Sequence, residues 1–225
     1  MGNLTDPLTR ALGKIEFYRN NGKSYGSASL VDGGNGSFIV VATAAHCLFD
    51  WEDKIFYNPV YFIPFNGKSR KRIKAKRAVI PNGWIKDAIV DYDTAFVVCE
   101  IDEVMEKGYP VQFKLEKGLE YKVYGFRDSI FKNNKPYIST GKAELDLQYS
   151  STLQGISSKG KGGMSGGPWL IEKNGAYIQN SLTSMSLKSK KNMLWGPYWG
   201  ETIKIAYEVA VGIIDKHSDV FIYDY

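Results

Sequence analysis

Long hydrophobic runs, cysteines and a signal segment are all scarce or missing in this sequence. No apolar run approaches the length needed to cross a membrane, so no membrane partner is expected. The 225 residues include two cysteines, Cys47 and Cys99, and nothing in the sequence pairs them. Secreted chains of this size often carry more, and no charged-then-apolar leader opens the sequence. The compartment therefore stays open, with the cytoplasm slightly favoured over a secreted mature chain.

Strong charge imbalance is also missing. The net charge of +5 is mild and does not by itself imply a nucleic-acid partner. The densest basic run, "KSRKRIKAKR" at residues 68–77, has no interleaved aromatics on which bases could stack. We interpret it as a strand with one solvated face, in preference to a patch for nucleic acid or an acidic partner. No nucleic acid, metal or cofactor is expected, and the oligomeric state stays open.

What the sequence does contain is strand-forming. Tyr, Phe, Trp, Val and Ile recur in short runs such as "SFIVVATAA" and "TAFVVCEI", bounded by turn signals such as "DGGNG" and "PNG". This texture predicts a β-sandwich or β-barrels. Apolar residues at helical spacing predict one clear helix over 200–215, and "TAAHCLF" predicts a single helical turn. The polar connection "EKGYPVQFKLEKG" best divides the chain into halves of residues 1–108 and 109–225.

One serine lies in an unusual setting. The stretch "KGGMSGGPW" surrounds Ser165 with four glycines, which suit positive φ angles or the close approach of another group. It predicts either a nucleophile flanked by backbone N–H groups or an ordinary glycine-rich turn between strands. An activated serine needs a base and a group that orients the base, so the rest of the chain must decide.

The candidate base is a histidine and the candidate acid an aspartate. His46 follows a strongly apolar strand, a place where a lone histidine would more often be a satisfied core residue. His217 lies in a polar tail and is a poor candidate. Asp93 is favoured over Asp91 because it directly precedes the apolar "TAFVV" run, although both could be simple strand-entry residues. An acid there could fix the tautomer of the imidazole and stabilise the imidazolium.

Chain order separates two classes of hydrolase. The residues 163–167 also satisfy the G-x-S-x-G pattern of α/β-hydrolases. That fold places its histidine after the serine, so it would need His217 and a strand–helix–strand pattern around Ser165. The observed order of His46, Asp93 and Ser165 is instead the chymotrypsin-type order.

The segments "TAAHC", "DYDTAFVV" and "GGMSGGPW", in that order, resemble those of the trypsin-like serine peptidases. The opening "GKIEFYRNNGKSYGSASLV" and the closing "GPYWGETIKIAYEVA" extend the resemblance toward the bacterial glutamyl-endopeptidase-like branch and over nearly the whole chain. The resemblance implies an all-β fold of two antiparallel barrels with a C-terminal helix. It also implies a serine endopeptidase that works through an acyl-enzyme on a polypeptide substrate. A catalytically silent scaffold that binds protein is the alternative.

The resemblance also implies roles for individual residues. Ser165 would attack the peptide carbonyl, His46 would carry the proton, and Asp93 would orient His46. The backbone N–H groups of Gly163 and Ser165 would form the oxyanion hole. Ser184 falls where the family places a serine that borders the acid. The residues Ser184, Met185 and Ser186 would form the edge strand that pairs with an extended substrate.

Departures from the family pattern limit what is carried over. Met164 replaces the aspartate that zymogen-type enzymes pair with a freed N-terminus, so no such switch is expected. Cys47 lacks the partner cysteine that many relatives carry on an earlier strand, and we expect a free, buried thiol. Thr183 stands where glutamate-preferring members carry a histidine, so glutamate preference is not inherited. Lys159 and Lys161 could favour an acidic substrate, although such lysines more often form a solvated loop.

Overall fold

The computed structural model describes residues 7–19, 22–65, 71–127, 135–148, 151–160, 162–187 and 190–225. The strands of the first half are β1 (Leu12–Arg19), β2 (Gly22–Asn35), β3 (Phe38–Thr43), β4 (Phe49–Asp50), β5 (Ile55–Phe56), β6 (Val60–Pro64), β7 (Ile73–Pro81) and β8 (Ala95–Glu100). Those of the second half are β9 (Glu120–Gly125), β10 (Tyr137–Lys142), β11 (Glu144–Leu145), β12 (Gln154–Ser157), β13 (Pro168–Lys173), β14 (Ala176–Leu182), β15 (Met193–Gly196) and β16 (Val220–Asp224). The helices are α1 (Asn82–Asp87) and α2 (Glu201–Ala210), with short 3-10 helices η1 (Pro7–Thr9), η2 (Ala45–Cys47) and η3 (Val90–Tyr92).

The first half forms a closed barrel. Its strands run in the order β7-β6-β1-β2-β3-β8, and β8 pairs back onto β7. Every pair in this barrel is antiparallel. Apolar runs explain the closure, because β3 and β8 keep nearly all their side chains buried. The last strand of the chain, β16, joins this sheet along the edge of β7.

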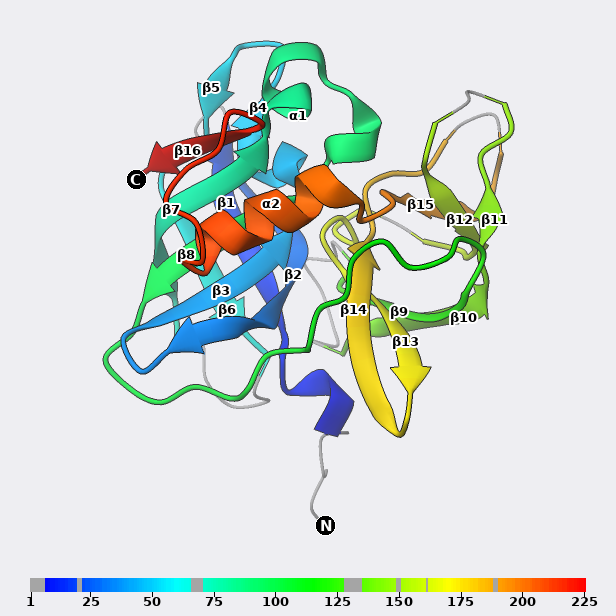
Figure 1. Cartoon of the computed structure of the whole chain (residues 1–225), viewed down its shortest axis with the longest axis horizontal. Coiled ribbons are helices and arrows are strands. Elements are labelled where there is room, and N and C mark those ends of the chain that lie inside the picture. The colour runs from blue at the N-terminus through cyan, green and yellow to red at the C-terminus, as the bar shows by residue number, and fades with distance from the viewer. Residues whose placement is uncertain are drawn as a thin grey trace.

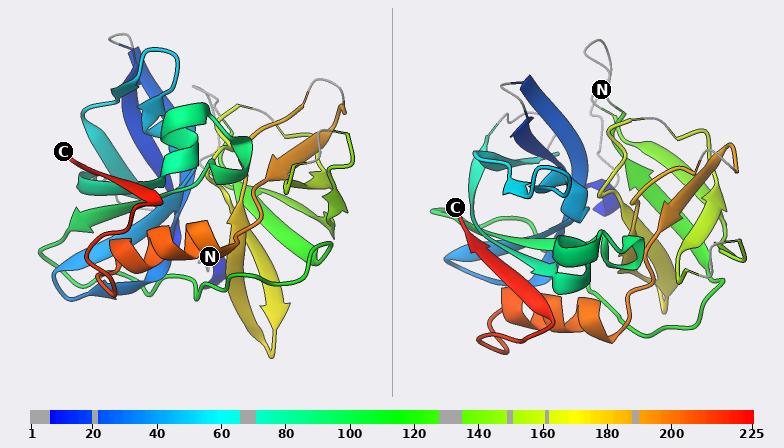
Figure 2. Two further views of the ribbon diagram at one scale, coloured as in Figure 1. Left: turned by 45° about the horizontal axis from the view of Figure 1, so that its top comes forward. Right: turned by 90° about the horizontal axis from the view of Figure 1, so that it is seen from above.

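The second half builds its core between two sheets. One has the strand order β10-β9-β13-β14 and the other β11-β12-β15. Val123, Trp169 and Ile178 from the first sheet share one apolar cluster with Ile156 and Leu194 from the second. The two halves lie side by side, with α2 against the first barrel (Figures 1 and 2). The predicted all-β double barrel with a C-terminal helix is confirmed.

The helices differ from prediction at their bounds. The predicted turn of "TAAHCLF" is η2, but the helix predicted over 200–215 ends at Ala210. Gly212 follows with a φ of +79°, and Ile213 is 69% exposed, so the apolar face does not continue. The turn predicted at "PNG" instead opens α1, whose Trp84 is buried. Burial of that side chain outweighs the weak local propensity of this glycine-containing segment.

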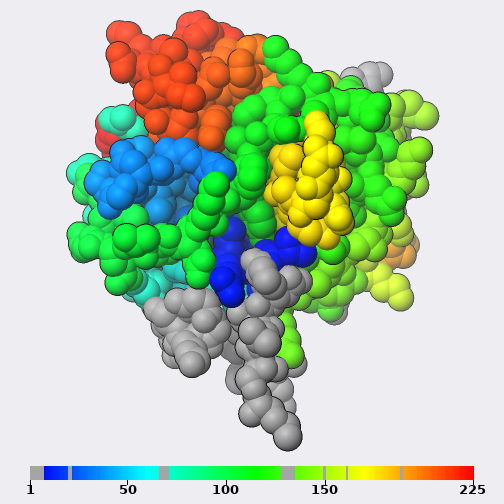
Figure 3. Space-filling model, turned by 60° about the horizontal axis from the view of Figure 1, so that its bottom comes forward, coloured from blue at the N-terminus to red at the C-terminus, as the bar shows by residue number. Residues whose placement is uncertain are grey.

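The connection between the halves crosses from one sheet system to the other. Tyr109 exchanges backbone hydrogen bonds with β2, and Gln112 and Pro110 bond the backbone of Gln179 in β14. Figure 3 shows this green connection between the blue strands of the first barrel and the yellow β13–β14 hairpin. The proposed division after residue 108 falls inside it and stays a prediction.

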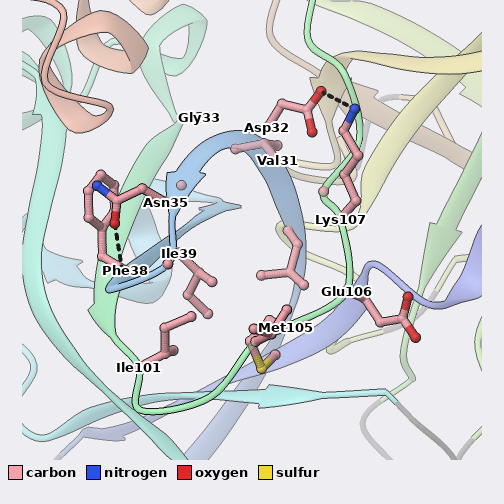
Figure 4. A pocket seen from close by; sticks show the side chains of 15 residues that line it. Val31, Asp32, Gly33, Asn35, Phe38, Ile39, Ile101, Met105, Glu106 and Lys107 are labelled. Atoms are coloured by element: carbon pink, nitrogen blue, oxygen red, sulfur yellow. Dashed lines mark hydrogen bonds and ion pairs between the residues drawn. The ribbon is translucent and has the colours of Figure 1, made fainter.

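A cavity of about 540 Å³ lies between this connection and the β2–β3 hairpin. Figure 4 shows its apolar wall, which includes Ile39, Ile101 and Met105, and the ion pair of Asp32 with Lys107 at 3.8 Å. Its lining includes none of the residues predicted to act in catalysis.

The basic run is a strand where it is described. In β7, Lys74 and Lys76 are exposed while Ile73 and Ala75 are buried, which confirms one solvated face. Residues 68–70 of the run lie outside the described residues. Of the helices in the described part of the chain, none is long and apolar enough to span a membrane.

Candidate functional site

His46 lies on η2, directly after the buried strand β3. The strand places the short turn at the end of the first barrel, where the imidazole is 35% exposed. Its Nδ1 lies 2.7 Å from Oδ2 of Asp93, and its backbone N–H donates to Oδ1 of Asp93 at 3.0 Å. Two bonds from one residue to one carboxylate fix both the backbone and the ring of His46.

Asp93 is fully buried and fully engaged. It follows η3 and precedes β8 by two residues, so it sits at the mouth of a buried strand as the sequence predicted. Besides His46, it accepts a hydrogen bond from the Ser184 hydroxyl at 2.5 Å. A buried carboxylate without partners would be costly, and these donors compensate for its burial.

Charge and burial act in opposite directions on this pair. Burial works to lower the pKa of His46, but the Asp93 carboxylate outweighs it and holds the pKa well above 6.5, with a smaller contribution from Cys47. Burial works to raise the pKa of Asp93, yet the charge of His46 and the hydrogen bonds from His46 and Ser184 lower it. The pair therefore favours imidazolium beside carboxylate, the ion pair that a histidine base forms once it has taken a proton.

The serine turn between β12 and β13 depends on its glycines. Gly163 and Gly166 have φ angles of +88° and +84°, a region that L residues rarely adopt. A Cβ on Gly166 would lie 2.1 Å from the Ser27 carbonyl oxygen and 2.3 Å from Oγ1 of Thr43. Met164 is 1% exposed and packs into the second core, so an apolar anchor replaces the zymogen-type aspartate. The turn is thus held against the first barrel as well as its own.

These contacts bring Ser165 beside the His46 turn. Gly166 approaches Thr43 and Ala44, which lead into η2, and the Ser165 carbonyl accepts the N–H of Ser27 at 2.7 Å. The Ser165 hydroxyl donates to the Ser184 carbonyl at 3.3 Å. Within the described residues it makes no hydrogen bond to His46. Ser184 therefore connects the two parts of the site, with its carbonyl toward Ser165 and its hydroxyl on Asp93.

Two backbone amides of this turn are without a described acceptor. Neither the N–H of Gly163 nor that of Ser165 donates to another described residue. The Gly163 carbonyl, in contrast, accepts from Oγ of Ser27 at 2.8 Å. Neither amide is therefore occupied by a described acceptor, and both can donate to an oxygen from another molecule.

The predicted substrate-binding residues have different surroundings. Ser184 is buried, Met185 is half-buried and pairs with Trp195 through backbone bonds, and Ser186 is exposed. The backbone groups of Ser186 bond no other described residue, as expected for a strand edge. Thr183 is 2% exposed, and its hydroxyl accepts the indole N–H of Trp169 at 3.0 Å.

The structure gives no support for substrate contacts by the two predicted lysines, Lys159 and Lys161. Lys159 is exposed, and its carbonyl accepts from Arg127 at 3.4 Å. Lys161 lies outside the described residues. The substrate contacts of Thr183 and Lys159 stay predictions.

The rejected candidates have other surroundings. His217 is exposed before β16, where its Nδ1 accepts the N–H of Asp219 at 3.2 Å. Asp91 accepts both the N–H and the hydroxyl of Thr152. Asp91 therefore joins the two halves close to the site.

Sequence reasoning missed the residues that hold the serine turn. Ser27 contacts both Gly163 and Ser165, and its hydroxyl also accepts the N–H of Phe126 at 2.7 Å. Within "YGSASLV" it looks like any small strand residue, so no local signal could have found it. Trp84, whose ring lies 6.4 Å from the ring of His46, was missed because its segment was taken for a turn.

The thiols agree with prediction. Cys47 and Cys99 are both free and buried. A Cβ on Gly26 would lie 2.7 Å from Sγ of Cys47, which places Gly26 opposite the thiol on the earlier strand.

The chain has the chymotrypsin-like double-barrel fold of the trypsin-like serine peptidases. Among solved structures, the chain is similar to the protease Anisep from Arthrobacter nicotinovorans, with 29% identity, 91% of this chain and 96% of that one covered, and a TM-score of 0.77. It is also similar to the thermostable serine protease AL20 from an extremophilic microorganism, with 29% identity, coverage of 93% and 100%, and a TM-score of 0.81.

A more distant likeness shows the same fold. Glu endopeptidase matches with 15% identity, 91% of both chains covered, and a TM-score of 0.71. No model of a known protein family and no curated protein matches the chain. The resemblance to trypsin-like peptidases read from three short segments is confirmed, and the likeness supports a protease function.

Proposed function

We propose that the protein is a serine endopeptidase that hydrolyses peptide bonds through Ser165, His46 and Asp93. The observation that carries this proposal is the buried Asp93 carboxylate on Nδ1 of His46, with the Ser165 turn fixed beside it. The Anisep and AL20 proteases share the fold over nearly the whole chain. Substrate class and activity are transferred from these likenesses.

The reaction would begin at the serine hydroxyl. Ser165 Oγ attacks the peptide carbonyl while Nε2 of His46 takes its proton, and the amine leaves with that proton to give an acyl-enzyme. Water then repeats the sequence and releases the acid. The hydroxyl must first turn from the Ser184 carbonyl toward His46, giving up a 3.3 Å bond. Catalytic hydrogen bonds are often long or poorly aligned before substrate binds.

The second half of the chain would supply the hydrogen bonds to the oxyanion and to the substrate backbone. The amides of Gly163 and Ser165 stabilise the developing oxyanion, and each such donor is worth about 3 kcal/mol of barrier. The Ser184–Ser186 edge would pair with the residues before the cleaved bond. Val90, Met185 and Leu187 pack against the small apolar cluster that contains Trp195, so this side of the site would offer apolar surface to substrate side chains.

The direct test is labelling with an organophosphonate ester, which reacts with activated serines. We expect a single adduct that peptide mapping places on Ser165, and no adduct in Ser165→Ala. Ser157→Ala, which removes an exposed serine of β12, should label like the original chain. Asp93→Asn should label about 10⁴-fold more slowly, as expected when the imidazole has the wrong tautomer.

Stability measurements separate chemistry from folding. Ser165→Ala should abolish cleavage of a peptide library while leaving the melting temperature nearly unchanged, because its hydroxyl makes one long bond. If well-folded protein takes up no label and cleaves no peptide, the endopeptidase proposal fails. Tight binding of a protein partner by both the original chain and Ser165→Ala would then support the alternative, a catalytically silent scaffold that binds protein.

A further inference from the structure

The chain continues beyond α2 into a C-terminal segment, residues 218–225, that ends beside elements flanking His46. Its strand β16 pairs with β7 from Val220 opposite Pro81 to Asp224 opposite Arg77. Figure 1 shows β16 along β7 and near β5 and α1. Two separate sets of contacts run from this segment toward His46.

The first set of contacts reaches α1. The backbone N–H of Asn82, the first residue of α1, donates to the Asp219 carbonyl at 2.8 Å. The Asn82 side-chain amide donates to the Ser218 carbonyl at 2.5 Å. Two residues later, Trp84 packs its ring 6.4 Å from the ring of His46. The C-terminal segment thus holds the start of the helix that covers one side of the imidazole.

The second set of contacts reaches the strand that follows His46. The rings of Phe221 and Tyr223 stack on Phe56 in β5, with centroid distances of 5.7 and 3.9 Å. Phe56 in turn packs on Phe49 at 4.8 Å and pairs with it in the β4–β5 ladder. Phe49 lies three residues after His46, so the aromatic stack ends on the chain that leaves η2.

We propose that the C-terminal segment is a positioning element for His46, fixing α1 and β4 so that Nδ1 stays on Asp93. Its residues make no described contact with Ser165, Asp93 or the imidazole itself, so it acts through Trp84 and Phe49. The proposal rests on the proposed function only for what His46 then does to a substrate.

The C-terminal segment would act on His46 through geometry and not through a charged group of its own. The groups that shift the pKa of His46 are Asp93 and Cys47, and no group of the C-terminal segment is among them. Asp224 is paired with Arg77 at 2.7 Å, and Asp219 lies 3.8 Å from His217. Loosening the contact between His46 and Asp93 should therefore lower the raised pKa of His46.

The test uses Tyr223→Ala, which removes the ring nearest to Phe56, in the full-length protein. The titration of His46 is followed by proton NMR of the Nδ1–H proton shared with Asp93, and by the acidic limb of kcat/KM. We expect the His46 midpoint to move to lower pH and kcat to fall about 10-fold with little change in KM, since small displacements of reacting groups are costly. Asn82→Ala removes the side-chain bond to the Ser218 carbonyl, although the backbone bond to Asp219 remains, and it should shift the midpoint in the same direction.

Two matched variants separate positioning from stability. Tyr223→Phe keeps the stacked ring and should behave like the original chain. Ile222→Ala changes the opposite face of β16, where the Ile222 side chain packs against the apolar core of the first barrel. It should lower the melting temperature by a similar amount while leaving the His46 midpoint in place. Equal midpoint shifts in Ile222→Ala and Tyr223→Ala, or no shift in Tyr223→Ala, would overturn the proposal.

The NMR measurement remains informative if the protein hydrolyses nothing. If the protein is inactive but its His46 midpoint shifts in Tyr223→Ala and Asn82→Ala, the positioning element is supported and the endopeptidase proposal fails. An active protein whose His46 midpoint is unchanged by both substitutions supports the endopeptidase proposal and overturns the positioning element.

Discussion

At the scale of single residues, the ionisation of His46 controls when the proposed chemistry can run. A general base must be neutral, so activity requires a pH above the pKa of His46. Asp93 holds that pKa well above 6.5. We therefore expect kcat/KM to rise with pH along an acidic limb whose midpoint lies above 6.5, measured with a peptide ester at constant ionic strength.

Asp93→Asn supplies the control for this limb. Asparagine removes the largest upward contribution to the imidazole pKa, while burial, which lowers that pKa, remains. The residual activity of this variant should show a midpoint at lower pH. A midpoint at or below 6.5 in the original chain would contradict the assignment of the limb to His46.

Cys47 offers a second prediction at this scale. Because a Cβ on Gly26 would lie 2.7 Å from the Cys47 sulfur, Gly26→Cys should form a disulfide on oxidation. Closing the loop between residues 26 and 47 should stabilise the fold by about 3 kcal/mol. Thiol titration of the unfolded, unreduced protein should then find only Cys99. The prediction fails if all thiols of the variant still react.

At the scale of elements, the serine turn depends on one close approach between the halves. Gly166→Ala would place a Cβ against the Ser27 carbonyl and the Thr43 hydroxyl at a φ of +84°. We expect labelling of Ser165 to be lost and stability to fall by more than about 2 kcal/mol, because backbone must move. Denaturant unfolding and labelling rates measure the two effects.

Gly175 in the β13–β14 hairpin is the matched control for this substitution. Its φ of +75° is similar, but a Cβ there meets nothing within 4 Å. Gly175→Ala should cost only about 1 kcal/mol, the strain of the backbone angle alone, and leave labelling intact. Equal losses in both variants would mean that the turn is not held by its contact with the first barrel.

At the scale of the whole molecule, the apolar core of the first barrel also includes residues from the second half of the chain. Tyr124, Leu170 and Trp199 belong to the same buried cluster as the strands of the first barrel. We therefore expect one cooperative unfolding transition by calorimetry, with van't Hoff and calorimetric enthalpies equal. Fragments 1–108 and 109–225 should not fold separately, since each would expose part of this cluster. Two resolved transitions would contradict this.

Sequence reasoning reached much of this molecule because its main signals are local. Short apolar runs and turn residues predicted the strands, and the order of His46, Asp93 and Ser165 predicted the fold type. The pairing of His46 with Asp93 is present as expected. The helix α1 was missed because Trp84 is buried by packing in the core of the first barrel, which no local sequence pattern reveals.

The sequence by itself determined the strand content and the three residues on which catalysis is proposed to depend. Tertiary structure alone decided that Ser27 holds the serine turn, that the Ser165 hydroxyl faces the Ser184 carbonyl, and that β16 returns to the first barrel. The physical reason is distance along the chain. Periodicity and turn chemistry act over a few residues, whereas these contacts join residues from 19 to 147 positions apart and form only when the chain packs.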